Sequence, residues 1–397
     1  MNQLSDRLNS LSPSETLAMS QKSNELKAQG IDVINLSVGE PDFFTPDHIK
    51  EAAKKAIDDN FSFYSPVPGY LPLRKAIAAK LKNENGLDYK PEQIVCSNGA
   101  KQSVCNTLLC IIGPEDEVII PAPYWVSYIE MVKLAEGKSV IVPAGIEQNF
   151  KITPAQLEAA ITPKTKAIIL CSPSNPTGSV YSKAELKGLV DVLVKYPNIM
   201  VIADEIYEHI NYIGKHESIA QFPEIKERVA LINGVSKAYA MTGWRLGFVA
   251  APEWLAKASN KLQGQYTSGP SSIAQKASEA AFAGDQAPVE EMRKAFERRR
   301  NLVLGLIKEI PGLECNTPDG AFYVFPKCNT YFGTSFGDRK INDSADLAMY
   351  LLEEGHVACV GGVAFGAPEC IRLSYATSDE NLVEAIKRIK QALANLK

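Results

Sequence analysis

The sequence is poor in the residues from which metal sites are built. It has only four histidines in 397 residues, and its eight cysteines include no Cys-x-x-Cys pair. Zinc sites are typically built from such pairs and from closely spaced histidines, so we expect no metal site. Several cysteines lie in apolar, strand-like runs, which is typical of buried, reduced thiols.

Long apolar runs and a strong excess of one charge are also absent. No apolar run approaches the roughly 20 residues that span a bilayer, and Met1–Asn9 lacks the apolar segment of a secretory signal. The net charge of −4 argues against a general binder of nucleic acid or of anionic membranes. We therefore expect a cytoplasmic protein with neither nucleic acid nor membrane as a partner.

The glycine-rich fingerprints of nucleotide-binding proteins are missing as well. No Gly-x-Gly-x-x-Gly follows a strand-like run, and the Ser97–Gln102 segment is not a Walker loop. A nicotinamide-dependent dehydrogenase is therefore excluded.

Helical and strand-like segments alternate from residue 46 to residue 248. The apolar, strand-like runs are 93–97, 117–121, 139–143, 166–172, 199–203, 229–232 and 246–250. Ser182 and Glu185 form the capping box of a predicted helix at 182–195, and Thr45 is the predicted N-cap of another at 47–58. This alternation indicates an α/β fold with a mostly parallel sheet between helices.

A different pattern follows residue 250. It predicts helices at 288–308, 343–354 and 379–396, and short strands at 322–325 and 371–375. Few strands and long helices of this kind favour a smaller α+β domain. We expect a large domain at 47–290 and a small domain formed by 1–46 and 291–397.

The segment 233–248 contains three groups that could act on one cofactor. The amine of Lys237 can form a Schiff base with a carbonyl, and Ser236 with Arg245 can hold a phosphate. A cofactor with both an aldehyde and a phosphate, such as pyridoxal 5′-phosphate (PLP), would use all three. The alternative interpretation of Lys237 alone is a solvated surface charge.

Three further segments follow predicted strands, where ligands bind in α/β sheets. Asp204 and Tyr207 could contact a ring nitrogen and a phenolate oxygen, although Asp204 could also cap the next element. Asn175 lies in a turn made rigid by two prolines, which is also ordinary turn chemistry. The stretch 97–102 joins a strand to a helix whose free amides can hold phosphate.

These segments carry a family resemblance. Ser-Asn-Pro-Thr-Gly at 174–178, Asp-Glu-Ile-Tyr at 204–207 and Ser-Lys-Ala-Tyr-Ala-Met-Thr-Gly-Trp-Arg-Leu-Gly at 236–247 occur in this order. The ordered set resembles the class I/II PLP-dependent aminotransferases of fold type I. The resemblance continues at 38–43, 64, 123–128 and 372–374, and so it covers nearly the whole chain.

The resemblance implies a role for each matching residue at the cofactor. Lys237 would be the Schiff-base lysine and the general acid and base, and Asp204 would keep the pyridine nitrogen protonated. Tyr207 and Asn175 would bind the ring oxygen, and Trp125 and Ile206 would lie on the two ring faces. The phosphate would be held by Gly99, Ala100, Lys101, Ser236, Arg245 and Tyr64 of the partner subunit. A homodimer with shared active sites is therefore expected.

The resemblance also implies how the substrate is bound by the small, closing domain. Arg372 would bind the α-carboxylate, Gly39 would leave room at the domain junction, and Trp125 and Asn175 would also contact the substrate. Leu11–Thr16 and Gly99–Lys101 resemble the bacterial aspartate aminotransferase subgroup. In that subgroup the distal carboxylate would be received by Lys101 with Ser14 and Thr16. A phosphate-side charge and an exposed residue at a helix start are the other interpretations of Lys101.

The implied reaction moves an amino group from an L-amino acid, most simply aspartate, to 2-oxoglutarate by a ping-pong mechanism. An aromatic, alanine or prephenate aminotransferase and a cysteine-conjugate β-lyase on the same fold stay open. An effector-sensing, aminotransferase-like domain is the non-enzymatic alternative. One departure from the family pattern is Val360–Gly366, where Pro-Gly is common, and it is expected to loosen the loop on the substrate side.

Overall fold

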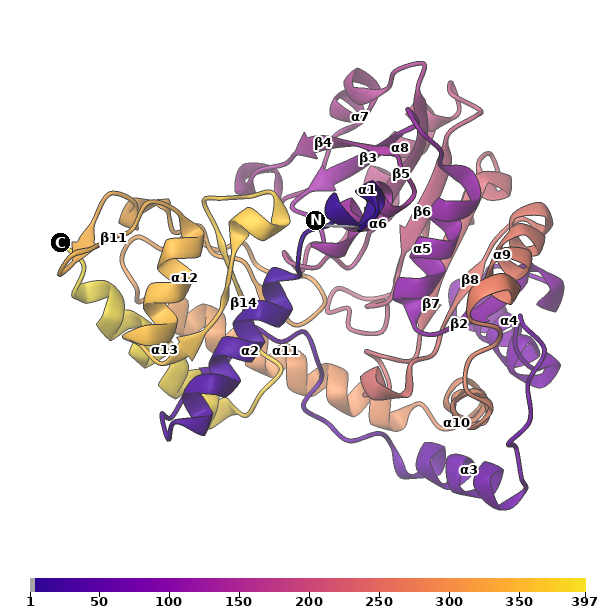
Figure 1. Ribbon diagram of the computed structural model, residues 1–397, viewed down its shortest axis with the longest axis horizontal. Helices are drawn as coiled ribbons and strands as arrows, with labels where there is room; N and C mark the ends of the chain where they lie inside the picture. Colours follow the sequence, from indigo (N-terminus) through magenta and orange to yellow (C-terminus); the bar gives the residue numbers. More distant parts are fainter. Residues whose placement is uncertain (1–3) are drawn as a thin grey trace.

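The computed structural model describes residues 4–397, and its largest element is a seven-stranded sheet (Figure 1). In spatial order its strands are β2 (Ile94–Ser97), β8 (Gly247–Ala250), β7 (Val229–Gly234), β6 (Met200–Asp204), β5 (Thr165–Cys171), β3 (Glu117–Ala122) and β4 (Lys138–Pro143). Strand β8 is antiparallel to both of its neighbours, and the other pairs are parallel. The seven predicted strands and the mostly parallel sheet are confirmed.

Helices pack against both faces of this sheet. One hydrophobic core contains α4 (Leu71–Asn85), α8 (Lys183–Leu193) and α10 (Ser272–Ala283). The core on the other face contains α5 (Ala100–Ile111), α6 (Ser127–Leu134) and α9 (Glu253–Tyr266). In β6, Val201 and Ala203 belong to the first core, and Met200 and Ile202 belong to the second. The two-residue period of a strand therefore directs Asp204, at the end of β6, to the side of α5 and α6.

The remaining chain forms shorter sheets and further helices. Three antiparallel strands lie in the order β13 (Val360–Gly361), β14 (Ile371–Ser374) and β9 (Tyr323–Val324). The two-stranded sheets are the parallel pair β1 (Ile34–Asn35) and β12 (Val357–Ala358), and the antiparallel pair β10 (Ser335–Phe336) and β11 (Arg339–Lys340). The other helices are α1 (Asp6–Asn9), α2 (Glu15–Ala28), α3 (Asp47–Asp58), α7 (Pro154–Ala160), α11 (Ala287–Ile307), α12 (Ser344–Glu353) and α13 (Asp379–Ala394). The helices and strands predicted after residue 250 are thus present. No helix within residues 4–397 is long and apolar enough to cross a membrane.

Helix α11 connects two hydrophobic cores. Val289, in its first turn, packs in the core that contains α4 and α8. Met292, Phe296 and Val303 pack in another core, which contains β9, β14 and α13. Figure 1 shows this helix passing from beneath the large sheet to the smaller sheets. The expected boundary between residues 290 and 291 lies inside the helix, and the division into two domains stays a prediction.

The two capping predictions had different outcomes. At the start of α8, Ser182 Oγ accepts a hydrogen bond from Glu185 N and Glu185 Oε2 accepts one from Ser182 N, so the capping box is confirmed. The prediction that Thr45 caps α3 is wrong, because Pro46 is the N-cap and makes no side-chain bond. Instead, Thr45 Oγ1 donates to the carbonyl oxygen of Ala240 at 2.8 Å. A contact with a distant loop has replaced the local cap.

Replacing Phe296 with Ala should destabilise the fold, because this ring fills the core shared by α11 and β9. Its centroid is 5.3 Å from that of Phe43 and 5.1 Å from that of Phe322. The expected loss is about 3–5 kcal/mol in the free energy of unfolding, measured by urea denaturation. Replacing the exposed Lys294 on the same helix with Ala is the control and should change it by less than about 0.5 kcal/mol. Similar losses in the two variants would contradict the assigned packing.

Candidate active site

A cavity of about 310 Å³ lies at the ends of β5 and β6, next to the turn that follows β7. This is the edge of an α/β sheet at which ligands bind. The predicted residues that line it are Ser14, Thr16, Gly39, Ala100, Lys101, Trp125, Asn175, Asp204, Ile206, Tyr207, Ser236, Lys237, Arg245 and Arg372. Two predicted residues do not line it: Gly99 is the N-cap of α5, and Tyr64 is 98% exposed beside a separate groove. The fold therefore brings together side chains that are up to 358 residues apart, because Ser14 and Arg372 share one cavity.

Lys237 provides an amine within this cavity. Its Nζ donates to the carbonyl oxygen of Gly39 at 2.6 Å, and no ion pair to Lys237 is found among residues 4–397. Burial lowers the pKa of Lys237 to about 8, and the positive charges of Arg372 and Arg245 act in the same direction. The neutral form of the amine, which a nucleophile or a general base requires, is therefore far more populated near neutral pH than in an exposed lysine.

Asp204 provides a buried carboxylate. Its Oδ2 accepts a hydrogen bond from the Tyr128 hydroxyl at 2.6 Å, and its Oδ1 accepts one from Ile206 N at 3.3 Å. Burial raises the pKa of Asp204, whereas these hydrogen bonds and Lys237 act to lower it. Within the described chain, no cation forms an ion pair with this carboxylate. A buried charge of this kind favours a positively charged group in the cavity.

Arg372, on β14, provides the opposite charge. Its guanidinium is 2% exposed, and it donates to Asn175 Oδ1 at 2.9 Å and to the Ser37 carbonyl oxygen at 2.5 Å. The centroids of the Tyr323 and Phe365 rings lie 4.6 Å and 5.0 Å from its Cζ, and its Nε has no hydrogen-bond partner among the described residues. No carboxylate forms an ion pair with Arg372 in the part of the chain that the structure describes. The group is thus prepared to bind an anionic ligand, and a guanidinium suits a carboxylate.

The start of α5 lies at one end of the cavity and offers free backbone donors there. The first backbone N–H groups of any helix have no acceptor within the helix, and here they belong to Ala100 and Lys101. Gly99 has a φ of +81°, and a Cβ at this position would collide with the guanidinium of Arg245. Ser236 and Arg245 also line this region. An amine, a buried carboxylate and an anion site in one cavity fit a cofactor with a carbonyl, a basic ring nitrogen and a phosphate.

The substrate side of the cavity includes the predicted residues of the N-terminal segment. Lys101 is exposed to the cavity, with its Nζ 4.9 Å from the centroid of Trp125. Partial burial, which disfavours the charged ammonium, and the nearby charge of Arg245 lower the pKa of Lys101. Ser14 and Thr16, at the start of α2, line the same cavity. The segment Val360–Gly366, which departs from the family pattern, pairs with β14 next to Arg372.

Sequence reasoning missed two tyrosines of this site. Tyr128 contacts Asp204, and Tyr323 forms a hydrogen bond with Tyr207, the hydroxyl oxygens being 2.8 Å apart. A Cβ at Gly39 would collide with the hydroxyl of Tyr323, so the size of residue 39 also matters. Tyr128 follows Trp125 by three residues, about one helical turn, and this spacing in the sequence could have indicated that the two rings lie together. Tyr323 lies in an apolar strand and gave none.

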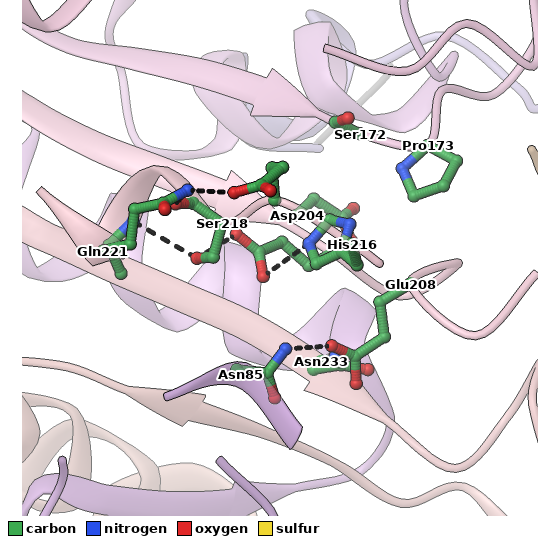
Figure 2. A network of polar contacts seen from close by, with 12 residues as sticks. Asn85, Ser172, Pro173, Asp204, Glu208, His216, Ser218, Gln221 and Asn233 are labelled. Atoms are coloured by element: carbon green, nitrogen blue, oxygen red, sulfur yellow. Dashed lines mark hydrogen bonds and ion pairs between the residues drawn. The ribbon is translucent and has the colours of Figure 1, made fainter. Parts of the chain in front are cut away.

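The turn that follows β6 has a second polar face behind the cavity. Glu205 Oε1 accepts from Ser218 Oγ at 2.6 Å, and Glu205 Oε2 lies 3.0 Å from His216 Nε2. Burial lowers the pKa of His216, but its pairing with Glu205 outweighs burial and the net shift is upward. Figure 2 shows His216, Ser218 and Glu208 grouped beside Asp204. These groups hold the turn from the side opposite to the cavity.

This second face contains a group of potential metal ligands that sequence spacing did not indicate. Glu205, Glu208 and His216 offer ligand atoms within 4.8 Å of one another. However, Glu208 Oε1 accepts from the ammonium of Lys80, and Glu208 Oε2 accepts from Asn85 Nδ2 at 2.8 Å (Figure 2). Glu208 therefore has no free ligand atom, and Glu205 and His216, which already face each other, cannot provide the four ligands that a structural zinc site requires. We interpret the group as an ion network that anchors the turn.

Comparisons with known proteins agree with this geometry. The family model described as aminotransferase class I and II matches residues 31–389. The aspartate/prephenate aminotransferase of Cereibacter sphaeroides is 49% identical over 396 residues, which cover 99% of each chain. The crystal structure of the aspartate aminotransferase from Rhizobium meliloti has a TM-score of 0.96 and 43% identity, with both chains covered completely. That of the Thermus thermophilus enzyme with maleate has a TM-score of 0.93 and 41% identity, with coverage of 99% of this chain and 100% of that one.

The likeness extends over the whole fold as well as over the cavity. The mostly parallel seven-stranded sheet, with helices on both faces, matches that of the aspartate aminotransferases. Family model, relatives and solved structures agree, and we conclude that the chain belongs to aminotransferase class I and II.

Proposed function

We propose that this aminotransferase uses PLP to move the amino group of aspartate to 2-oxoglutarate. The observation that supports the proposal most strongly is the pair of buried, opposite charges in the Lys237 cavity. Within residues 4–397, Asp204 and Arg372 have only neutral hydrogen-bond partners. Each is therefore suited to a charged group of a ligand, the first to a protonated ring nitrogen and the second to a carboxylate.

The residues around the cavity would divide the binding of PLP among them. Ser236, Arg245 and the first amides of α5 would hold the phosphate, and Tyr207 with Asn175 would bind the ring oxygen. Trp125 and Ile206 would flank the ring. When bound, PLP supplies a carbonyl carbon that condenses with amines and a protonated ring that accepts electrons from the substrate Cα.

The protein would orient the substrate and transfer its proton. Arg372 would bind the α-carboxylate and so fix the direction of the Cα–H bond. The neutral amine of Lys237 would remove the Cα proton and return it to the adjacent carbon of the cofactor. Asp204, as a carboxylate, would keep the ring nitrogen protonated while electron density moves into the ring. Release of the first oxo acid before the second binds gives ping-pong kinetics.

Specificity for a dicarboxylate would depend on the N-terminal segment and on Lys101. The ammonium of Lys101 and the hydroxyls of Ser14 and Thr16 offer a cation and two donors. Two observations support this choice: the similar Rhizobium meliloti protein is an aspartate aminotransferase, and the similar Thermus thermophilus structure contains maleate, which is a dicarboxylate. The Cereibacter sphaeroides relative has prephenate in its name, which favours prephenate as a second acceptor to be assayed.

We further propose a homodimer in the cytoplasm. Tyr64 is 98% exposed, and Phe63 beside it is 82% exposed. Both lie on a groove with Ser62, Ser65 and the 269–272 segment. Adjacent exposed aromatic side chains favour a protein interface. From there, Tyr64 would reach the phosphate site of the other subunit.

The proposed reaction is tested by adding single amino acids to the holoenzyme without any oxo acid. Aspartate and glutamate should convert the bound cofactor from its aldehyde form to its amine form, which is followed by the change in absorbance. Alanine should cause this conversion only weakly. Replacing Lys237 with Ala should abolish this conversion, because both the attachment of the cofactor and the proton transfer are lost. Replacing the exposed Lys261 with Ala is the control and should leave the conversion unchanged. Conversion by the Lys237→Ala variant at the wild-type rate would refute the proposal.

The reaction of the apoprotein with PLP should depend on pH through Lys237. Only the neutral amine attacks a carbonyl, and the pKa of Lys237 is lowered from 10.5 to about 8. The rate, followed by stopped-flow absorbance, should therefore rise with pH, with a midpoint near pH 8 and a plateau above it. A blocked lysine derivative mixed with PLP at each pH serves as the reference. A midpoint shared with that reference would contradict the assigned environment of Lys237.

Replacing Lys101 with Ser should weaken the use of dicarboxylic donors selectively. The loss of a charged hydrogen bond to the distal carboxylate should lower kcat/KM for aspartate and glutamate by about 10- to 100-fold. For phenylalanine, which has no distal carboxylate, the value should change little. Steady-state kinetics with the three donors make the comparison. Equal losses of kcat/KM for all three donors would contradict a role in binding the distal carboxylate and would favour a role of Lys101 on the phosphate side.

A further inference from the structure

Tyr128 meets Asp204 because of the register of the large sheet. Helix α6 covers the face to which Met200 and Ile202 of β6 point, and Asp204 follows them with the same two-residue period. The side chain of Tyr128 is 2% exposed, and its hydroxyl donates to Asp204 Oδ2 at 2.6 Å. Its ring is held by Trp125, the two rings being perpendicular at 5.3 Å. The donor therefore has a fixed position.

Tyr128 is the one side chain that donates a hydrogen bond to Asp204 within residues 4–397. The other donor is a backbone group, Ile206 N, at the longer distance of 3.3 Å. Burial and the adjacent carboxylate raise the pKa of Tyr128 well above its usual value, so its hydroxyl keeps its proton. A hydrogen bond to a charged acceptor in a buried site is among the stronger ones.

Three other titratable groups act on Asp204 from neighbouring elements. Glu205, the next residue, raises the pKa of Asp204, and Lys237, after β7, lowers it. Cys171, at the end of β5, is a neutral thiol, because burial raises its pKa to about 12. None of the three forms a recorded hydrogen bond with the carboxylate within the described residues. The directional side-chain contact with the Asp204 carboxylate is therefore the hydrogen bond from Tyr128.

We propose that Tyr128 is a positioning residue for the transamination reaction, whose hydroxyl keeps Asp204 ionised and oriented toward the ring nitrogen of the cofactor. The inference rests on the proposed function of the cavity. Loss of this hydroxyl would leave a buried carboxylate with one weak donor, and its protonated form would become more favourable. A protonated Asp204 cannot attract a positively charged ring nitrogen. The effect should therefore be largest at low pH.

The test is the affinity of the apoprotein for PLP as a function of pH, measured by equilibrium dialysis. Tyr128→Phe should raise by about one unit the pH below which affinity for PLP is lost, so it should bind PLP about tenfold more weakly below that midpoint and lose less affinity at higher pH. The ionisations of PLP itself are the same for every protein variant, so the difference between variants reports on the protein. Tyr350→Phe is the matched control, because Tyr350 is a buried tyrosine that donates to the Ala392 carbonyl oxygen at 2.8 Å in a different core. It should keep the wild-type pH profile even if it lowers stability.

A second variant separates the hydrogen bond from a general packing role. Incorporation of 3-fluorotyrosine at position 128 keeps the ring and the hydroxyl but makes the hydroxyl a stronger donor. The pH midpoint should then move downward, opposite to its shift in Tyr128→Phe. Midpoints that are unchanged in both variants, or an affinity loss that is equal at every pH, would overturn the role of Tyr128. Wild-type protein that binds no PLP would instead overturn the proposed function on which the inference rests.

Discussion

The active site depends on charges that are buried next to neutral partners. Asp204 is held by a phenol and a backbone amide, and Arg372 by an amide oxygen and a backbone carbonyl. Such partners fix the direction of a charged group and satisfy part of its hydrogen-bonding capacity, but they leave its charge uncompensated. The stability that is lost in this way is recovered when a ligand of opposite charge binds. The cavity is thus suited to a charged ligand because the charges of Asp204 and Arg372 are buried but not neutralised.

The two faces of one short turn illustrate this condition. On the cavity side, no residue among 4–397 forms an ion pair with Asp204, whereas behind it Glu205 faces His216 and Glu208 contacts Lys80. The ion pairs of the second face leave little capacity for a ligand, and they connect the turn to α4 and to the 216–218 loop. The same residue types therefore serve structure on one face and ligand binding on the other. What differs is the charge of the partner.

The fold could be predicted from the sequence further than the site could. Seven apolar runs predicted seven strands because a strand that is buried on both faces must be continuously apolar, and this constraint is local. The ordered motifs located the residues that line the cavity. By contrast, the contact of Tyr128 with Asp204 joins residues 76 positions apart, and that of Thr45 with Ala240 joins residues 195 positions apart. Local patterns do not show which distant residue such a side chain contacts, so the N-cap of α3 was misassigned and the partner of Tyr128 was missed even though its spacing from Trp125 was visible.

The groups of the cavity also come from different parts of the chain. Those suited to the cofactor, such as Asp204 and Lys237, lie at the ends of strands in the large sheet, whereas Arg372 belongs to the small sheet that contains β9. The two parts are connected by the continuous helix α11, where Arg299 forms two hydrogen bonds with Asp42, at 2.7 Å and 2.9 Å. A rotation about this connection would move the guanidinium of Arg372, proposed to bind the carboxylate, relative to the amine of Lys237. The orientation of Cα–H toward Lys237 would thus be set by how the two sheets are held together, while the environment of Asp204 depends on the large sheet alone.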